Sequence, residues 1–256
     1  MKVLICDTPD AAVERAAGMI CAHLRDRPDT VLGLATGGTM LPLYGRLIAA
    51  HRDGLSFARA TTFNLDEYVG LPPDHPASYH AYMRQHLFCH IDIDPTRTHL
   101  PRGDAPDPVA EAARYEALIA AAGGIGLQLL GIGRNGHIGF NEPISSLASR
   151  TRVKALTEST RAANSPYFAP GETPPTHAIT VGVATILSAG ECLLLATGAD
   201  KAPAVAAMVE GPLAAICPAS ALQLHPRATV VLDRDAASAL RLTDYYQLAH
   251  NGGAPA

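Results

Sequence analysis

The chain has few of the residues that stabilise small disulfide-rich or zinc-binding proteins. Its 256 residues include only five cysteines, and no two of them form a Cys-x-x-Cys pair. An odd number of scattered cysteines gives little support for a disulfide framework or a zinc site. The histidines between residues 75 and 99 match no compact ligand spacing and have no acidic cluster beside them. We therefore expect no metal site.

Other absences exclude classes of partner. The formal net charge is -4, and no cluster of lysine and arginine offers a surface for nucleic acid. No apolar run approaches the roughly 18 residues that a membrane helix needs. The apolar run at residues 3–6 is too short for a signal sequence. We expect a protein of the cytoplasm that binds neither nucleic acid nor membranes.

What remains is the composition of a globular protein, with 48% hydrophobic and 17% charged residues. Short β-branched and aliphatic runs alternate along the chain with helix-like stretches. This alternation favours an α/β fold, in which a mostly parallel sheet is covered by helices on both faces. The predicted strands are residues 3–6, 31–35, 60–63, 125–130, 191–196 and 229–232. The predicted helices are residues 10–25, 41–52, 78–88, 108–121, 183–188, 201–209 and 236–240.

We predict a single domain over residues 1–256, because strand and helix signals continue after the proline-containing segment 165–175. That segment is predicted to be a mobile excursion, within a lid of about residues 157–178. In an α/β fold, ligands bind beyond the carboxyl ends of the strands. Three polar or glycine-rich loops follow predicted strands, so we expect them to meet at that edge.

The most informative of these loops covers residues 130–143 and reads LGIGRNGHIGFNEP. Its glycines remove side chains where the backbone turns or approaches a ligand. His137 can exchange a proton near neutral pH, and Glu142 can orient the imidazole or carry a proton itself. The alternative is that both residues merely cap a turn. Three of the glycines fit the spacing of a dinucleotide motif, but no helix-like run follows them, so we reject that interpretation.

A second loop contains Thr36, Gly37, Gly38 and Thr39, which join a predicted strand to a predicted helix. Backbone amides and threonine hydroxyls at the positive end of a helix can bind an anion such as phosphate. An ordinary turn that uses glycine for its geometry would explain the same residues. Lys201, near the start of a later predicted helix, can add a positive charge, although a single lysine is commonly solvated.

The third loop places Asp66 directly after a predicted strand, within the sequence NLDEY. A strand end holds a carboxylate rigidly, and burial would raise its pKa towards the range in which it can abstract a proton next to a carbonyl. The adjacent Glu67 is expected to point another way. The alternative is that Asp66 caps the next helix.

Together these segments resemble the glucosamine-6-phosphate deaminase family, also called glucosamine-6-phosphate isomerases. The resemblance implies a Rossmann-like fold and no metal or organic cofactor. It implies an enzyme that converts glucosamine 6-phosphate and water into fructose 6-phosphate and ammonia. The motifs that carry it cover most of the chain and are LATGGT at 34–39, TTFNLDEYVGL at 61–71, HPASYHAYM at 75–83, LGIGRNGHIGFNEP at 130–143, SSLASRTRVKAL at 145–156, THAITVGVATILSA at 176–189 and ALQLHP at 221–226.

The resemblance also implies a role for each candidate residue. Asp66 matches the base that moves a proton between C2 and C1 of the opened sugar. His137 matches the residue that opens the pyranose ring, with Glu142 and Asn135 as its partners. Ring opening must come first, because the open aldehyde makes the C2 proton acidic. The phosphate-side positions correspond to Gly37, Gly38, Thr39 and Lys201.

The chain departs from the family pattern in the phosphate site and in the loop of residues 130–143 that carries His137 (the histidine loop). Members commonly have a phosphate-binding arginine where this chain has Pro166, so a bidentate phosphate contact is missing. Arg161 is the candidate that would replace it, unless Lys201 and the loop amides suffice. Asn135 stands where some members have aspartate, and asparagine can orient His137 without supplying a charge.

Some members of the family are hexamers that N-acetylglucosamine 6-phosphate activates. The matching segment of this chain keeps Ser145, Arg152 and Lys154 but has Ala155 in place of a hydroxyl residue. Two interpretations stay open for these residues, an allosteric site in a homo-oligomer or the solvated face of a strand.

Two other functions compete with the deaminase. A 6-phosphogluconolactonase of the same superfamily hydrolyses a lactone and needs no aldose-ketose base, so the Asp66 segment and the complete GHIGFNEP run favour the deaminase. A sugar-phosphate sensor would keep the loop from Thr36 to Thr39 and lose the acid-base residues, all of which are present. The sequence leaves open whether the amino sugar is a glucosamine or a galactosamine phosphate.

Overall fold

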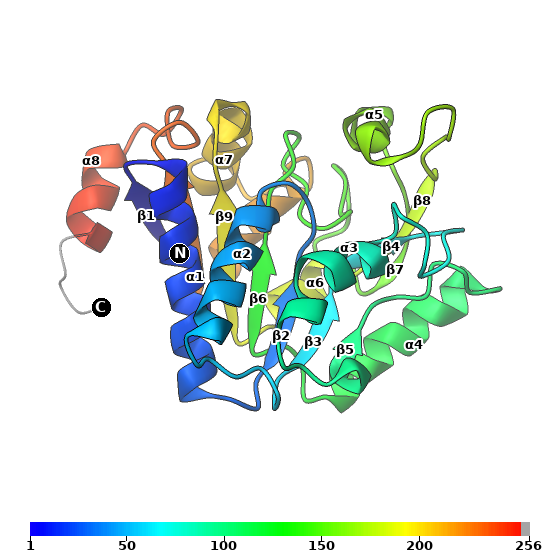
Figure 1. Cartoon of the computed structure of the whole chain (residues 1–256). Coiled ribbons are helices and arrows are strands. Elements are labelled where there is room, and N and C mark those ends of the chain that lie inside the picture. Colours follow the sequence, from blue (N-terminus) through cyan, green and yellow to red (C-terminus); the bar gives the residue numbers. More distant parts are fainter. Residues whose placement is uncertain (252–256) are drawn as a thin grey trace.

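A parallel seven-stranded sheet forms the centre of the computed structural model, which describes residues 1–251 (Figure 1). Every neighbouring pair in this sheet is parallel. The strands, in spatial order, are β1 (Lys2–Cys6), β10 (Ala228–Asp233), β9 (Glu191–Ala196), β6 (Leu127–Leu130), β2 (Val31–Leu34), β3 (Thr61–Asn64) and β5 (Thr98–His99). The six predicted strands are therefore confirmed, and the two-residue β5 is added at one edge.

Helices follow the strands as predicted. The predicted helices that the structure contains are α1 (Pro9–Asp26), α2 (Met40–Arg52), α3 (Tyr79–His86), α4 (Pro108–Ala121), α6 (Val183–Leu187) and α7 (Ala202–Val209). Side chains cap α1, α3 and α4, as Thr8 does when its hydroxyl accepts a hydrogen bond from Ala11 N. None of the helices in the described part of the chain is long and apolar enough to cross a bilayer.

The order of the strands creates a switch point in the middle of the sheet. From β1 through β2 and β3 to β5 the chain moves towards one edge, and from β6 through β9 to β10 it returns. Because crossovers between parallel strands are right-handed, α1 and α2 lie together on one face, and α7 lies on the other. The direction reverses between the adjacent strands β2 and β6, and ligands bind at such points.

A small antiparallel sheet extends the fold beyond this edge and was not predicted. Its order is β4 (Asp66–Tyr68), β8 (His177–Thr180) and β7 (Arg152–Ala155). These strands have three or four residues each, too few to show a period-two pattern. Leu65 joins the two sheets, because its N–H donates to Leu34 O and its carbonyl accepts from Val181 N.

The predicted helix at residues 236–240 is wrong, because this stretch forms a series of turns. The carboxylate of Asp233 accepts hydrogen bonds from Ala236 N and from Gly198 N, which holds the chain in a turn beside β9. Five residues are also too few to offset the cost of starting a helix. Helical structure comes later, in α8 (Thr243–Tyr246) and a π-helical turn (Gln247–Asn251).

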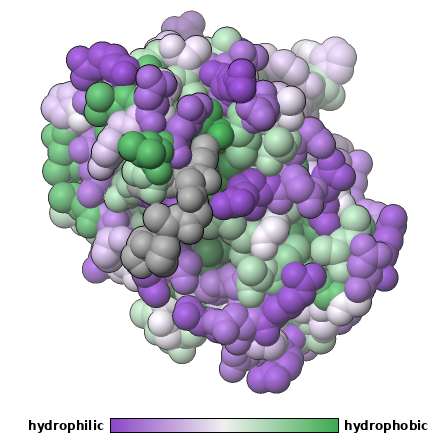
Figure 2. All heavy atoms as spheres, turned by 90° about the vertical axis from the view of Figure 1, so that its left-hand side faces the viewer, coloured by the Kyte–Doolittle hydropathy of each residue, from purple (hydrophilic) through white to green (hydrophobic). Residues whose placement is uncertain are grey.

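Short helical elements complete the described structure. One α-helix, α5 (Glu158–Asn164), lies within the segment predicted as a lid. The 3-10 helices are Phe88–His90, Pro95–Arg97, Ser165–Tyr167, Ala199–Lys201 and Pro218–Leu224. Figure 2 shows the end of the molecule that carries β1 and α8, where hydrophilic residues and smaller hydrophobic patches are interspersed.

Gly182, which precedes α6, is predicted to be required because there is no room for a side chain at this position. An added Cβ at Gly182 would lie 2.1 Å from Ser149 O, and this carbonyl is held in place by Ala184 N. We expect Gly182→Ala to lower the free energy of unfolding by about 3 kcal/mol, as overpacking does. Gly18→Ala is the matched control, because a Cβ in the middle of α1 meets nothing within 4 Å and should stabilise the helix by about 1 kcal/mol. Urea unfolding measures both changes, and equal effects would contradict the prediction.

Candidate active site

Three loops meet at the carboxyl ends of β2, β3 and β6. The loop after β2 contains Thr36 to Thr39, and the loop after β6 is the histidine loop, which carries His137. β2 pairs with β3 on one side and with β6 on the other, so their following loops are neighbours. Gly139 of the histidine loop comes so close to Asp66 that an added Cβ would lie 3.2 Å from its Oδ2. The structure therefore brings Asp66 against the loop that carries His137, as the sequence predicts.

Asp66 is a buried carboxylate with an unusual affinity for protons. It is the first residue of β4, pairs with Thr180 of β8 and is 5% exposed. Burial raises its pKa to about 8, and the charge of Glu67 adds to this rise, whereas the backbone N–H of Phe140 opposes it. When it is ionised, a carboxylate of this kind is a stronger base than an ordinary aspartate, which suits it to abstract a proton from carbon.

Glu67 is completely buried next to Asp66, and the sequence analysis gave it no role. Successive strand residues point to opposite faces, so Glu67 faces α3 while Asp66 faces the histidine loop. Its carboxylate accepts hydrogen bonds from Tyr79 N, His80 N and His80 Nδ1 at 2.9–3.1 Å. All three residues of the DEY strand are buried, so no local alternation marks this second buried acid.

His137 and Glu142 lie side by side in the histidine loop. The imidazole Nδ1 is 3.6 Å from Glu142 Oε2, a distance for an ion pair and not for a hydrogen bond. Gly133 makes room for the ring, since a Cβ there would lie 2.2 Å from His137 Cε1. Asn135 holds the arrangement by donating from Nδ2 to Glu142 Oε2 at 2.9 Å and accepting at Oδ1 from His137 N at 3.2 Å.

Glu142 remains ionised across the range of physiological pH. Burial alone would raise its pKa, but His137, the Thr160 hydroxyl and the Asn135 amide outweigh burial and lower the pKa to about 2. Its second oxygen, Oε1, accepts from Thr157 N and Thr157 Oγ1, both at 3.2 Å. Thr157 caps α5, so Glu142 connects the imidazole to the first turn of the segment 157–178.

The loop after β2, from Thr36 to Thr39 (the anion loop), leads into the start of α2. Gly37 has φ of 114°, a conformation that favours glycine, and its carbonyl accepts from the Tyr82 hydroxyl at 2.8 Å. Thr39 precedes α2 and makes no capping hydrogen bond with its side chain. The Thr39 hydroxyl is therefore not used as a cap, while the first two N–H groups of the helix, those of Met40 and Leu41, donate to Gly37 O and Gly38 O at 3.0 and 3.4 Å.

Lys201 belongs to the same edge of the sheet. It lies after β9, the neighbour of β6, and its Nζ is 3.7 Å from Asp200 Oδ2. Arg134 of the histidine loop binds the same carboxylate at 2.9 Å. Burial lowers the pKa of Lys201, and the charge of Asp200 opposes this shift.

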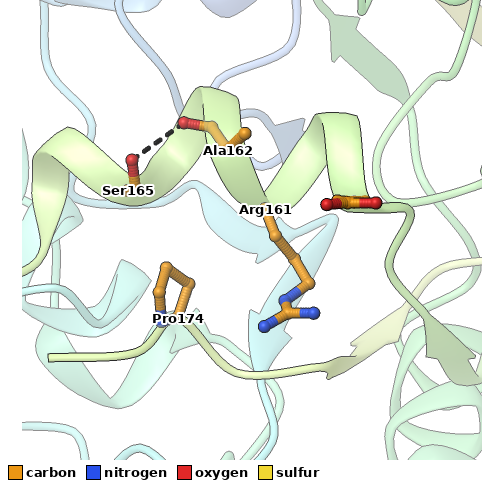
Figure 3. Close-up of a pocket in the computed structure, with 5 residues that line it drawn as sticks. Arg161, Ala162, Ser165 and Pro174 are labelled. Atoms are coloured by element: carbon orange, nitrogen blue, oxygen red, sulfur yellow. Dashed lines mark hydrogen bonds between the residues drawn. The ribbon is translucent and has the colours of Figure 1, made fainter.

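The structure does not bring Arg161 to this edge. It projects from α5 into an open hollow of about 310 Å³ that it shares with Glu158, Ala162, Ser165 and Pro174 (Figure 3). Its Nε is buried without a hydrogen-bond partner, and among the described residues nothing joins its side chain to the anion loop.

Ser145 and Arg152 are next to the histidine loop. They are not solvated as residues on an exposed strand face would be. The Ser145 hydroxyl is buried and has no partner among the described residues. Arg152 Nη1 donates to Asn141 Oδ1 at 2.9 Å, while its Nη2 is buried without a partner. Lys154 lies on β7 opposite Ala178 of β8.

Comparison with known proteins places these features in a family. Residues 7–231 match the family model described as glucosamine-6-phosphate isomerases/6-phosphogluconolactonase. The chain is 54% identical to the glucosamine-6-phosphate deaminase of Hahella chejuensis, over 96% of this chain and 95% of that protein. It is 55% identical to the glucosamine-6-phosphate deaminase of Rhodopirellula baltica, over 94% of this chain and 96% of that protein.

Solved structures share the fold. A monomeric glucosamine-6-phosphate deaminase superposes with a TM-score of 0.91 at 50% identity, covering 93% of this chain and all of that chain. A 6-phosphogluconolactonase from Trypanosoma cruzi superposes with a TM-score of 0.76 at 21% identity, covering 94% of this chain and 97% of that chain. At this lower identity the likeness shows the fold alone.

Asp66 and Glu142 should make the free energy of unfolding depend on pH in opposite ways. Folding raises the pKa of Asp66, so the folded protein binds this proton more tightly than the unfolded chain does. The stability that this proton contributes is complete below pH 3.8 and is lost as the pH rises through about 8. The pKa of Glu142 is lowered, so its contribution is complete above 4.5 and is lost as pH falls towards 2. We expect Asp66→Asn to raise the free energy of unfolding at pH 9 by roughly a few kcal/mol, and to change it little at pH 4.

Glu142→Gln provides the matched comparison. It should lower the free energy of unfolding at pH 7, and its difference from the wild type should narrow at pH 3. Urea unfolding at pH 3, 4, 7 and 9 measures these changes. An Asp66→Asn variant with the wild-type stability at pH 9 would show that burial does not disfavour the Asp66 carboxylate.

Proposed function

The chain belongs to the family of glucosamine-6-phosphate isomerases and 6-phosphogluconolactonases, and we propose that it is a glucosamine-6-phosphate deaminase. The reaction converts glucosamine 6-phosphate and water into fructose 6-phosphate and ammonia. One observation carries the proposal: a buried, strongly basic Asp66 lies against the loop that presents His137. The identity of 54–55% to relatives named as deaminases supports the same reaction. Lactone hydrolysis would make no use of such a base.

The first step opens the pyranose ring. His137 transfers the proton between the C1 hydroxyl and the ring oxygen, which converts the hemiacetal into the open aldehyde. Glu142 stays negative because of its low pKa, and its Oε2 lies 3.6 Å from the imidazole Nδ1. Asn135 orients Glu142 by its hydrogen bond.

The second step moves a proton and the third releases ammonia. Asp66 removes the proton from C2, which the adjacent aldehyde makes acidic, and the electron pair moves to the aldehyde oxygen, which gives an enolate with the amino group on C2. Return of the proton to C1, with transfer of one N–H proton to the C1 oxygen, leaves an imine at C2. Water adds to this carbon, and ammonia leaves as the ketone forms. Each step uses groups of this chain, water and substrate.

The phosphate is proposed to bind at the start of α2. The backbone amides of Gly37 and Gly38, with the hydroxyls of Thr36 and Thr39, would surround its oxygens. Lys201 would add a charge from the neighbouring strand end. Arg161 is too poorly connected to this loop to be assigned with them, which leaves the missing contact at Pro166 to another residue.

Other predictions remain proposals about the whole protein. We infer that residues 1–256 act as one domain in the cytoplasm and that residues 157–178 form a lid over the site. Ser145, Arg152 and Lys154 are the proposed allosteric residues, because buried polar atoms of the first two lack partners beside the histidine loop. Association into a homo-oligomer stays a prediction, and the site described here uses residues of one chain.

Ammonia release tests the proposed reaction. Wild-type protein should produce ammonia and fructose 6-phosphate in equal amounts from glucosamine 6-phosphate, and Asp66→Asn should lower kcat/KM by about 10²–10⁴-fold, as loss of a general base does. Asp29→Asn is the control, since Asp29 is exposed and precedes β2 at the opposite edge of the sheet. Parallel assays with galactosamine 6-phosphate and with 6-phosphogluconolactone separate the alternatives. Lactone hydrolysis without ammonia release would refute the proposal.

The pH dependence of the reaction should report the pKa of Asp66. We expect kcat/KM to increase with pH up to about 8, because only the carboxylate can accept the C2 proton. Glu67→Gln removes the neighbouring negative charge, so the midpoint of this increase should move to lower pH. Glu191→Gln, which alters a carboxylate beside His23 at the start of β9, should leave the midpoint unchanged. Identical midpoints in all three proteins would remove Glu67 from this role.

A further inference from the structure

Two tyrosine hydroxyls face the anion loop from different elements. Tyr82 of α3 donates to the carbonyl of Gly37 at 2.8 Å and so supports the backbone of the loop. Tyr167 comes from the segment 157–178, more than a hundred residues after the anion loop in the sequence. Its hydroxyl lies 3.7 Å from the position that a Cβ on Gly38 would occupy. The loop is therefore covered at Gly38 by a phenol and not by a side chain of its own.

The hydroxyl of Tyr167 is available to a ligand. No hydrogen bond to it is found among residues 1–251, whereas the hydroxyls of Tyr82 and Tyr115 are both engaged with backbone carbonyls. Tyr167 is 57% exposed, which is unusual for a large aromatic residue at a site of otherwise buried tyrosines. A neutral phenol donates one hydrogen bond, and phosphate oxygens are strong acceptors.

The backbone around Tyr167 is held on both sides. Pro166 lies within the 3-10 helix Ser165–Tyr167, and its ring restricts the backbone before Tyr167. Phe168 is buried and packs on Tyr68, with ring centroids 5.6 Å apart. The next turn is tied down by an ion pair of 2.8 Å between His75 and Glu172. Because the hydroxyl is placed before a ligand arrives, little conformational entropy is lost on binding.

From this geometry we propose that the Tyr167 hydroxyl donates a hydrogen bond to the phosphate group bound by the loop from Thr36 to Thr39. The inference rests on the proposed function, and it assigns Tyr167 as a substrate-binding residue. Apart from its chain neighbours, only the Tyr167 hydroxyl lies within 4 Å of the Cβ position at Gly38, so no side chain stands between this glycine and the phenol. The same contact connects the phosphate to the segment that Glu142 holds at Thr157.

Tyr167→Phe tests the assignment, because it removes the hydroxyl and keeps the ring. We expect the KM for glucosamine 6-phosphate to rise roughly tenfold, as for loss of a hydrogen bond to a charged group, with kcat changed less than about twofold. The kcat/KM for unphosphorylated glucosamine should not change. Tyr245→Phe is the matched control, since Tyr245 is similarly exposed but lies in α8, and it should behave as the wild type. An unchanged KM in Tyr167→Phe, or an equal loss with both substrates, would overturn the inference.

A binding measurement separates this inference from the proposed reaction. Calorimetric titration with inorganic phosphate needs no turnover, and the dissociation constant should increase by a similar factor in Tyr167→Phe and not in Tyr245→Phe. If wild-type protein releases no ammonia but phosphate binding still depends on Tyr167, the proposed reaction fails and the phosphate contact stands. If the wild type is active and Tyr167→Phe binds phosphate as tightly, only the Tyr167 assignment fails.

Discussion

The hydrogen bonds on either side of Leu65 are the constraint on which the site depends. Its N–H donates to β2 of the parallel sheet, and its carbonyl accepts from Val181 at the end of β8. The chain therefore leaves one sheet and enters the other within a single residue. Asp66 follows immediately and is held where the two sheets meet the histidine loop. A carboxylate in that position cannot reach bulk water, and its high pKa is the consequence.

The site separates two carboxylates by environment. Asp66 is surrounded by apolar groups and by the charge of Glu67, so it holds its proton tightly. Glu142 receives donors from Asn135 and Thr157 and faces an imidazole, so it stays charged. Such a pair, with pKa values moved in opposite directions, can provide a base for carbon acids and a fixed charge for the ring-opening histidine. The buried Asp66 disfavours the folded state at high pH, which is a cost that function imposes on stability.

The segment after Thr157 connects three parts of the site. Glu142 accepts a hydrogen bond from Thr157, the first residue of the segment. Phe168, near its middle, lies in a buried apolar cluster, and the Tyr167 hydroxyl reaches the anion loop. The cluster packs Phe168 with Tyr68 and Phe140, which flank Asp66 and Gly139 in the sequence.

The sequence by itself determined the alternating strands and helices and the loops that carry Asp66, His137 and the anion-binding glycines, because these depend on local patterns of hydrophobicity and turn residues. It did not reveal the small sheet, whose strands are too short for periodicity, or the roles of Glu67 and Tyr167, which depend on contacts between distant segments. It also indicated a helix at 236–240, where the carboxylate of Asp233 stabilises turns instead. Only the tertiary structure decided which acid is buried, which is paired and which hydroxyl remains free. Burial and pairing are set by neighbours in space, and no local pattern along the chain encodes them.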